Sequence, residues 1–218
     1  MAQARVASFK QAYHRVNRRY RRDSLLASFY TFYRTWTCPF QQIFAHVPDG
    51  GRIIDVGCGN GFVTLWTALV FPNARVLGID MNAGRIDTAR KHSRDTANVS
   101  FAVGDITGLP LERADVFLLI DLLHHICWDD QLALLDACVD RLSPGGMVVL
   151  KDIGVTPRWK YCFHYLQDSL HYRQKLFCRE PEKYTAFFTD RGMQARYIPL
   201  DKGYPYPHYM ITARRPQP

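Results

Sequence analysis

The stretch RIIDVGCGNG, residues 52–61, decides how the middle of this 218-residue chain folds. Apolar residues precede the acid Asp55, and three glycines then follow at alternate positions, Gly57, Gly59 and Gly61. A short apolar run of this kind is typical of a buried strand. Glycines directly after it let the chain turn sharply and let a ligand lie against bare backbone. The stretch therefore predicts a strand that leads into a ligand-binding turn.

The spacing of the glycines narrows the choice of ligand. The dinucleotide fingerprint G-x-G-x-x-G needs a third glycine where this chain has Phe62, and no G-K-[ST] follows as a P-loop would require. Asp55 stands two residues before Gly57, where a carboxylate is an awkward neighbour for a pyrophosphate. It suits a ligand that carries an ammonium or sulfonium group.

Strands and helices alternate on both sides of this turn. The expected strands cover 52–56, 74–80, 99–105, 114–121 and 147–153, with helices at 61–71, 82–95 and 129–142 and a turn at 143–146. Strands separated by helices of this length indicate a parallel sheet with helices on both faces. Two further strands are expected at 194–200 and 208–214.

The flanking segments read mainly as helix. Residues 3–35 contain no proline and carry apolar residues near helical spacing, and Pro39 then breaks the pattern. An aromatic-rich helix is expected over 157–178 and another over 181–191, with Gly192 at its C-terminal cap. We therefore predict a basic N-terminal helical segment, 1–48, and a domain, 49–218, in which 157–191 form a helical lid or insertion.

The positive charge of the chain lies at one end. Residues 1–22 contain seven arginines and lysines and no acid, and the whole chain has 28 basic against 20 acidic residues, so the remainder holds 21 against 20. Such an arm favours a phospholipid surface or a nucleic acid, and the alternative is a solvated helix face that docks on the body. Six scattered cysteines without a C-x-x-C pair, and no apolar run of about 20 residues, indicate the cytoplasm, with peripheral attachment to the inner face of the membrane.

Two more acids follow strand ends where a nucleoside would need them. Asp80 ends the strand in LGID, where a carboxylate can accept both ribose hydroxyls, and Asp105 ends the strand in VGD, placed for an adenine amino group. Either acid alone could simply cap the next helix. Together with Asp55 they converge on the carboxyl edge of the sheet, where open α/β folds bind ligands.

From Arg52 to Ile153 the chain resembles the class I (Rossmann-like, seven-stranded) S-adenosylmethionine-dependent methyltransferases. IIDVGCGNG matches the first motif of that family, GID its ribose-binding acid, GDI its adenine contact and LSPGGMVVLKD its fifth-strand motif. The resemblance implies an α/β, doubly wound, mostly parallel seven-stranded sheet with an antiparallel last hairpin. It also implies S-adenosyl-L-methionine as cofactor and S-adenosyl-L-homocysteine as product. The cofactor-binding residues that it implies are Asp55, Gly57, Cys58, Gly59, Asp80, Met81, Asp105, Ile106 and Asp121.

In this family the residues after the fourth strand face the methyl group, and here they read DLLHHICWDD, 121–130. His125 matches the usual HH position and His124 precedes it, and a histidine near a hydroxyl can act as a base at neutral pH. The alternatives are that the histidines only shape the pocket and that His124 is a partly exposed residue at a helix start. No [NDS]-P-P-[YF] motif for amide or exocyclic nitrogens is present, and no ligand cluster indicates a metal.

The substrate-binding candidates are aromatic residues and histidines of the insertion and the last hairpin. They are Trp159, Tyr165, Tyr172, Tyr206 and His208. The alternative is that these rings pack on the sheet. The leading hypothesis is methylation, on oxygen, of a small or lipid-like molecule, with the basic arm on an anionic membrane surface. The alternatives are an RNA methyltransferase that grips phosphates with residues 1–22, and a cofactor-binding partner of another enzyme.

Overall fold

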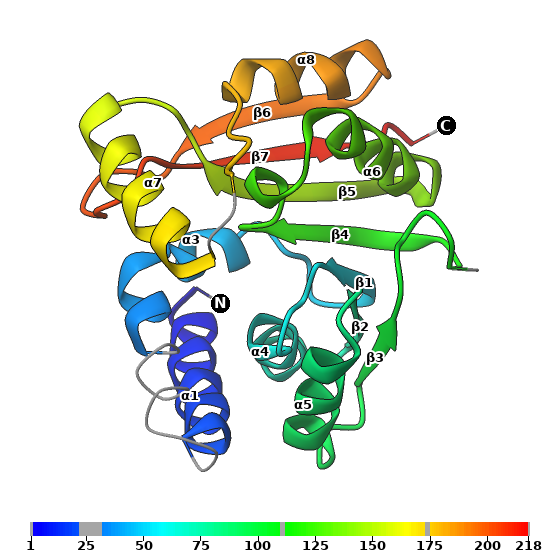
Figure 1. Cartoon of the computed structure of the whole chain (residues 1–218). Helices are drawn as coiled ribbons and strands as arrows, with labels where there is room; N and C mark the ends of the chain where they lie inside the picture. The colour runs from blue at the N-terminus through cyan, green and yellow to red at the C-terminus, as the bar shows by residue number, and fades with distance from the viewer. Residues whose placement is uncertain (1, 22–31, 110–111, 173–174, 218) are drawn as a thin grey trace. The chain divides into compact units, whose positions relative to one another are not determined.

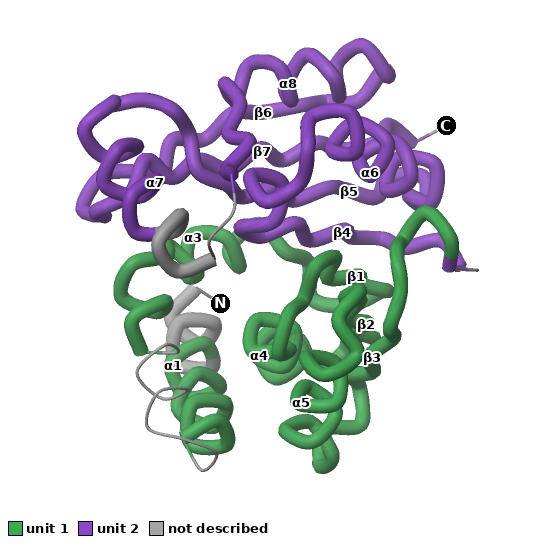
Figure 2. The backbone as a smooth tube through the Cα atoms, in the orientation of Figure 1, with its two compact units in different colours: residues 1–108 green, residues 109–218 purple. Residues whose placement is uncertain are grey.

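The computed structural model of the chain describes residues 2–21, 32–109, 112–172 and 175–217, without the side chains of 2–8 and 168–172. These residues form two compact units, 1–108 and 109–218, which Figure 2 distinguishes by colour. Each unit is built from strands and helices in alternation, as the sequence predicts. The division of the chain at residue 48 stays a prediction.

The elements follow the predicted order (Figure 1). Unit 1 contains α1 (Ala2–Tyr20), α3 (Phe40–Phe44), β1 (Gly51–Val56), α4 (Phe62–Val70), β2 (Ala74–Asp80), α5 (Ala83–Ser93) and β3 (Val99–Val103). Unit 2 contains β4 (Ala114–Ile120), the 3₁₀ turn η1 (Leu123–His125), α6 (Trp128–Asp140), β5 (Leu142–Ile153), α7 (Arg158–Tyr172), α8 (Pro181–Asp190), β6 (Gln194–Pro199) and β7 (His208–Arg214).

The strands confirm the predicted fold class. In unit 1, β2 pairs in parallel with both β1 and β3. In unit 2, β4 and β5 are parallel, whereas β7 is antiparallel to both β5 and β6. The seven strands have the order β3-β2-β1-β4-β5-β7-β6, which is a mostly parallel sheet with an antiparallel last hairpin.

Three predicted boundaries differ most from the structure, and others shift by one or two residues: β3, for example, ends at Val103, so Asp105 follows the strand and does not end it. The turn expected at 143–146 lies inside β5, as an irregularity: Ala114 pairs with Leu142 but Val116 already pairs with Met147, so the intervening residues bulge out of the ladder. The helix expected over 157–178 ends at Tyr172. The helix expected over 3–35 ends at Tyr20, residues 32–37 are helical again, and 22–31 lie outside the described residues.

Helix α1 is part of the core of unit 1. It buries Ala12, Val16 and Tyr20 and packs along α4. The ring of Trp66, fully buried on α4, lies 4.5 Å from the ring of Phe9, and its Nε1 donates to the Phe9 carbonyl at 3.1 Å. One face of the basic arm therefore docks on the body. No helix in the described part of the chain is long and apolar enough to cross a membrane.

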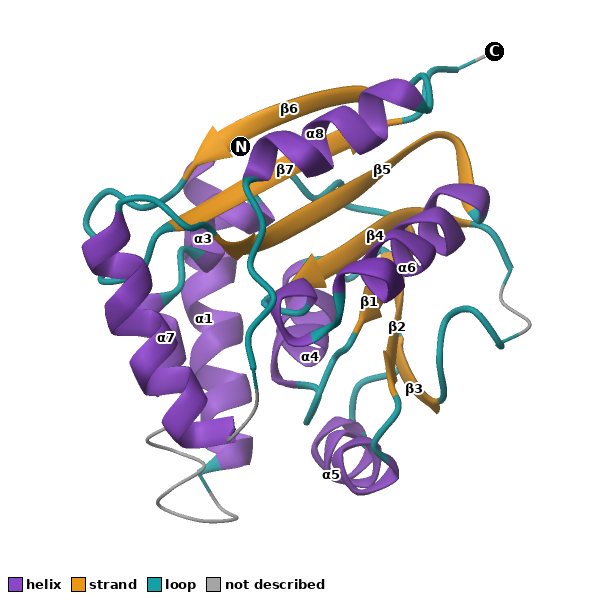
Figure 3. Ribbon diagram, turned by 45° about the horizontal axis from the view of Figure 1, so that its top comes forward, coloured by secondary structure: helices purple, strands orange, loops and turns teal. Residues whose placement is uncertain are grey.

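In unit 2, helices and strands share one apolar core. Helix α6 packs against β5, and α8 packs against β6 and β7, as Figure 3 shows. Strands β4 and β5 are buried almost throughout, which is typical of parallel strands covered on both faces. Apart from Asp115 and Ser143 near the strand starts, the polar residues of β4 and β5 lie at and beyond their carboxyl ends, from Asp121 and from Lys151. The chemistry-bearing residues of unit 2 therefore collect there.

Candidate functional site

The glycine turn after β1 is fixed to the end of β2. Gly57, Gly59 and Gly61 all have positive φ, at 70°, 56° and 78°, a region that side chains disfavour. The amides of Gly57 and Cys58 both donate to the Ile79 carbonyl, at 2.8 and 2.9 Å. The turn therefore has one conformation that its glycines and β2 together determine.

Asp80 is held by the same turn. The amide of Gly59 donates to its Oδ2 at 2.8 Å, and the amide of Asn82 donates to its Oδ1 at 2.9 Å. Both carboxylate oxygens keep further lone pairs for acceptor bonds. The predicted ribose-binding acid thus stands oriented beside the glycine turn.

Two of the glycines serve different purposes. A Cβ at Gly61 would lie 2.5 Å from the Ala89 Cβ and 2.8 Å from the Phe101 ring, so Gly61 allows close packing. A Cβ at Gly59 would meet no described atom within 4 Å. Open space over bare backbone beside an oriented carboxylate fits a nucleoside cofactor, which needs close approach and a hydroxyl acceptor.

Asp55 is buried behind the turn, 3% exposed, and accepts a hydrogen bond from Thr64 Oγ1 at 2.6 Å. Burial raises the pKa of this carboxyl to about 7, against smaller opposing effects of the Thr64 bond and of Arg34. Its predicted contact with a cationic ligand group stays a prediction. Burial likewise raises the pKa of the Cys58 thiol far above its usual value, so Cys58 keeps its proton and is no nucleophile.

The remaining cofactor candidates of unit 1 follow β2 and β3. The amide of Gly104 donates to the Asp80 carbonyl at 3.0 Å, which brings the two strand ends together. Asp105 is exposed and accepts from the Thr107 amide at 3.0 Å, whereas Ile106 is buried. Met81 is 76% exposed. An exposed carboxylate can accept a hydrogen bond from the edge of a nucleobase such as adenine, and an apolar side chain beside it can pack against the face of that base.

Tyr20 supports the turn from α1, and motif reading missed this role. Its hydroxyl donates to the Asn60 carbonyl at 2.6 Å, between Gly59 and Gly61, and its ring stacks on His92 at 4.1 Å. The only sequence signal for Tyr20 is its place in the apolar helical pattern of residues 3–35. That pattern predicts burial but not this bond.

In unit 2, Asp121 directly follows β4. Its φ of 54° is the only positive value of a non-glycine residue in the described part of the chain. Its amide donates to the Lys151 carbonyl at 2.9 Å, and its carboxylate pairs with the ammonium of Lys151, which is fully buried. This pair holds a backbone conformation that would otherwise be disfavoured.

His124 is buried and paired, which corrects the alternative of a partly exposed residue at a helix start. Only 3% of it is exposed, and its Nδ1 contacts Oδ1 of Asp152 at the end of β5. Asp152 also accepts from the amides of His124 (3.2 Å, Oδ2) and Ile153 (2.8 Å, Oδ1). Both oxygens thus act as acceptors, so Nδ1 carries a proton, and in the neutral imidazole Nε2 is the nitrogen with the lone pair.

Rings from three parts of unit 2 surround His124. His125, half-buried, lies 4.0 Å away between centroids, and His164 of α7 meets His124 edge-on at 5.5 Å. The ring of His164 also lies 5.1 Å from that of Tyr206, and the ring of Tyr206 lies 5.6 Å from that of His208, both measured between ring centroids. Two of the predicted substrate residues, Tyr206 and His208, therefore join the two histidines through the ring of His164.

The other substrate candidates lie apart from this cluster. Trp159 and Tyr165 on α7 are 67% and 37% exposed, so neither ring is buried in the core. The side chain of Tyr172 lies outside the described residues. The inner face of α7 instead carries Lys160, which bonds to the Asp201 carbonyl at 2.6 Å, and His164.

Comparison with known proteins places these residues in a wider context. Residues 53–146 match the family model described as a methyltransferase domain. The chain is 32% identical over 114 residues to a ubiquinone biosynthesis O-methyltransferase of Xanthomonas axonopodis pv. citri, and 31% identical over 164 residues to one of Xylella fastidiosa. These alignments cover 50% and 66% of this chain.

The chain spans 46% of the length of the Xanthomonas relative and 65% of the length of the Xylella one. Among solved structures it is similar to human N-acetylserotonin methyltransferase in complex with S-adenosylmethionine, with a TM-score of 0.67 and 19% identity. That match covers 88% of this chain and 56% of the human one. At this identity the likeness concerns the fold.

Proposed function

The chain belongs to the class I, Rossmann-like S-adenosylmethionine-dependent methyltransferases, and we propose that it methylates a hydroxyl oxygen of a small, lipid-like molecule. S-adenosylmethionine, the cofactor of this family, supplies an electrophilic methyl group on a sulfonium. The chain itself has to hold this cofactor, orient the acceptor and remove the proton of the acceptor. We assign the first task to the open backbone at Gly59 and to the acids Asp80 and Asp105.

The pair of His124 and Asp152 is the observation that carries this proposal. Asp152 holds the imidazole in the tautomer whose Nε2 can accept a proton, and burial excludes competing water. A hydroxyl needs such a base when it becomes a nucleophile at neutral pH. His124 is therefore the proposed base, and His125, whose ring is tilted against that of His124 and more exposed, is the proposed wall of the acceptor site.

Two further observations favour a ring-bearing or lipid-like acceptor. The relatives named above act, by their names, in ubiquinone biosynthesis as O-methyltransferases. The His124 cluster also presents the rings of Tyr206 and His208, both buried. Aromatic side chains combined with placed polar groups such as these imidazoles are typical of pockets for flat ligands that carry a polar substituent.

The test uses S-adenosylmethionine labelled on its methyl group. The full chain is incubated with host extract, and label is counted in organic-soluble, RNA and protein fractions. We expect label in the organic phase. The matched variant is Gly59→Ala, whose Cβ meets no described atom and which therefore folds, with about 1–2 kcal/mol of strain, but obstructs the cofactor.

Label in RNA would overturn the proposal and favour the RNA alternative. Label in protein would exclude both the small-molecule proposal and the RNA alternative. Full labelling by Gly59→Ala would show that the open space beside this glycine does not receive the cofactor. Cofactor binding without any transfer would favour the non-enzymatic alternative.

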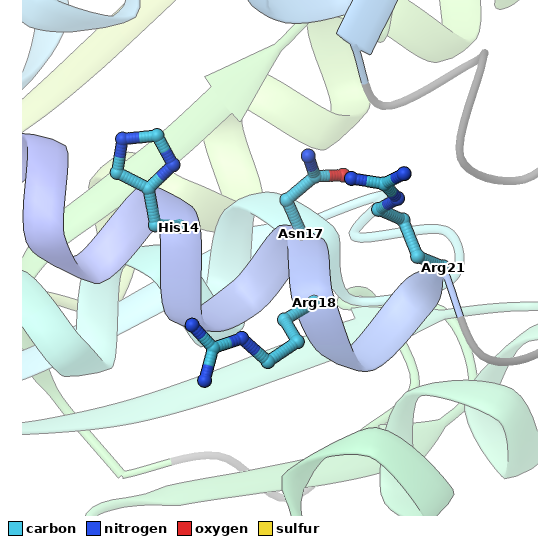
Figure 4. A pocket seen from close by; sticks show the side chains of 4 residues that line it. All are labelled: His14, Asn17, Arg18 and Arg21. Carbon is cyan, nitrogen blue, oxygen red and sulfur yellow. The ribbon is translucent and has the colours of Figure 1, made fainter.

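We also propose that the outer face of α1 binds an anionic membrane surface. Lys10, His14, Arg18 and Arg21 follow one another at spacings of four, four and three residues, and all are exposed. On a helix these positions form one stripe about 16 Å long. With Asn17, the last three line a hollow beside α1 (Figure 4). We call Lys10, His14, Arg18 and Arg21 the cationic stripe.

Arg19 shows that the stripe is distinct from the docked face. Its guanidinium donates to the His92 carbonyl at 2.8 Å and to Thr96 Oγ1 at 3.0 Å, so it is committed to the body of unit 1. Deleting the arm would remove these bonds together with the buried Val16 and Tyr20. A charge-reversal variant is therefore the sharper test.

In the variant Lys10→Glu/Arg18→Glu/Arg21→Glu, binding to vesicles of phosphatidylglycerol should weaken at least about 100-fold, because each basic residue near such a surface contributes about 1 kcal/mol. Vesicle co-sedimentation at low salt measures the loss. The control Arg75→Glu/Arg85→Glu/Arg94→Glu reverses three exposed charges off the stripe and should retain binding. Equal weakening in both variants, or RNA binding that only the stripe variant loses, would contradict the membrane assignment.

A further inference from the structure

Gln131, the fourth residue of α6, is a fully buried junction between three segments of unit 2. Its Nε2, with two N–H groups of which one is shared, donates to the carbonyls of Leu123 at 2.8 Å, Ile126 at 2.9 Å and Phe177 at 2.9 Å. Its Oε1 accepts from the Tyr184 hydroxyl of α8 at 2.7 Å. One amide therefore joins both ends of the η1 turn, the segment after α7 and helix α8.

The orientation of this amide is unambiguous. If the nitrogen and oxygen were exchanged, the oxygen would face three carbonyl oxygens, which only accept. Tyr184 supports the same assignment, because burial, with a smaller effect of the charge on Asp152, raises the pKa of its hydroxyl far above the usual value. The hydroxyl thus keeps its proton and donates to Gln131.

The junction encloses the backbone of His124. Leu123 and Ile126, which Gln131 binds, stand on either side of the two histidines. The amide of Phe177 donates to the His124 carbonyl at 2.8 Å, and the carbonyl of Phe177 is itself held by Gln131. The turn that carries His124 is therefore fixed by a side chain outside the ring cluster.

We propose that Gln131 and Tyr184 are positioning residues that keep His124 in its bond with Asp152. This inference rests on the proposed function, in which His124 is the base. A free turn at η1 would let the imidazole rotate and exchange tautomers. The three carbonyls and the Tyr184 hydroxyl that converge on Gln131 instead fix the backbone from which the ring projects.

Nitrogen NMR of the full chain labelled with ¹⁵N-histidine tests the proposal without any substrate. Two-bond proton–nitrogen correlations should show His124 in one tautomer, protonated at Nδ1, with the signal assigned by its loss in His124→Asn. In Gln131→Met the two nitrogen shifts should move toward each other as the tautomers average. Exchange protection of the Phe177 amide should fall at least tenfold.

Tyr184→Phe removes one bond of the junction. The two nitrogen shifts of His124 should therefore approach each other, and the exchange protection of the Phe177 amide should fall, by smaller amounts than in Gln131→Met. The matched control is Thr185→Val on the same helix, which deletes a hydroxyl bonded only to the Pro181 carbonyl at 3.0 Å and should change neither signal.

A folded Gln131→Met with an unchanged His124 tautomer would overturn the proposal. If Gln131→Met does not fold, Tyr184→Phe decides by the same signals, and an unchanged tautomer and amide would overturn it. The proposed function fails separately, if His124→Asn retains full turnover, because the NMR experiment measures position and not catalysis.

Discussion

Replacing His124 by asparagine is expected to lower turnover about 10²–10⁴-fold, the range that a positioned general base contributes. The reason is the bond to Asp152, which leaves Nε2 as the proton-accepting atom of a buried ring. Asp152→Asn should lower turnover in the same direction, because an amide that donates to the ring can stabilise the wrong tautomer. His125→Asn, one position along, is the matched control and should cost less than about tenfold.

The measurement is the rate of transfer to the acceptor found in the organic fraction, at saturating cofactor. Binding of S-adenosylhomocysteine, followed by calorimetry, should stay unchanged in all three variants and so separate catalysis from cofactor affinity. A larger loss in His125→Asn than in His124→Asn would place the base at the position that the family resemblance favours. The pair of His124 and Asp152 would then support the fold of this turn and would not act as the base.

The sequence predicted those parts of the fold whose signals are local. Strands β2 and β7 have the predicted bounds, because an apolar strand that ends in turn residues is recognisable without its neighbours. The glycine turn after β1 and the place of Asp80 at the end of β2 were also predicted, because a turn that needs positive φ restricts its own residues. Gly192, with a φ of 70° just beyond α8, is a further local signal that the structure confirms.

Partners from distant parts of the chain could not be predicted in this way. Asp152 stands 28 residues after His124, and their contact depends on how β4 and β5 align, with Ile120 opposite Lys151. Gln131 reads as an ordinary polar position of an amphipathic helix, and its role depends on carbonyls from two other segments. Tertiary bonds also explain why 175–178 is not helical as expected, since Phe177 bonds to His124 and to Gln131.

Asp55→Asn is expected to stabilise the chain at pH 8 by up to about 4 kcal/mol. Burial raises the pKa of this carboxyl from its usual 3.8 to about 7. One pKa unit corresponds to about 1.4 kcal/mol, so this rise of roughly three units costs about 4 kcal/mol once the group is ionised in both states. Asparagine carries no charge and still offers Thr64 an acceptor.

The sign of the effect fixes its pH range. Below about pH 4 Asp55 is protonated in both folded and unfolded chains, so wild type and variant should have similar free energies of unfolding. Between pH 4 and 7 the unfolded chain releases the proton while the folded chain retains it, which favours unfolding as the pH rises. The gain from Asp55→Asn should therefore grow over this interval and level off above pH 7.

Urea unfolding at several pH values from 4 to 8 measures the gain. Asp87→Asn is the control, because the Asp87 side chain is 73% exposed and its replacement should change stability by less than about 0.5 kcal/mol at any of these values. A gain that does not depend on pH would show that packing, and not ionisation, accounts for it.

The same variant tests why a costly acid stands behind the glycine turn. If Asp55 faces a cationic group of the cofactor, as its place two residues before Gly57 predicts, the stabilised variant should bind S-adenosylmethionine more weakly, by about tenfold or more for the loss of one charged bond. Stability would then have been given up for affinity, as is common at binding sites. A stabilised variant with unchanged affinity would instead limit Asp55 to its bond with Thr64.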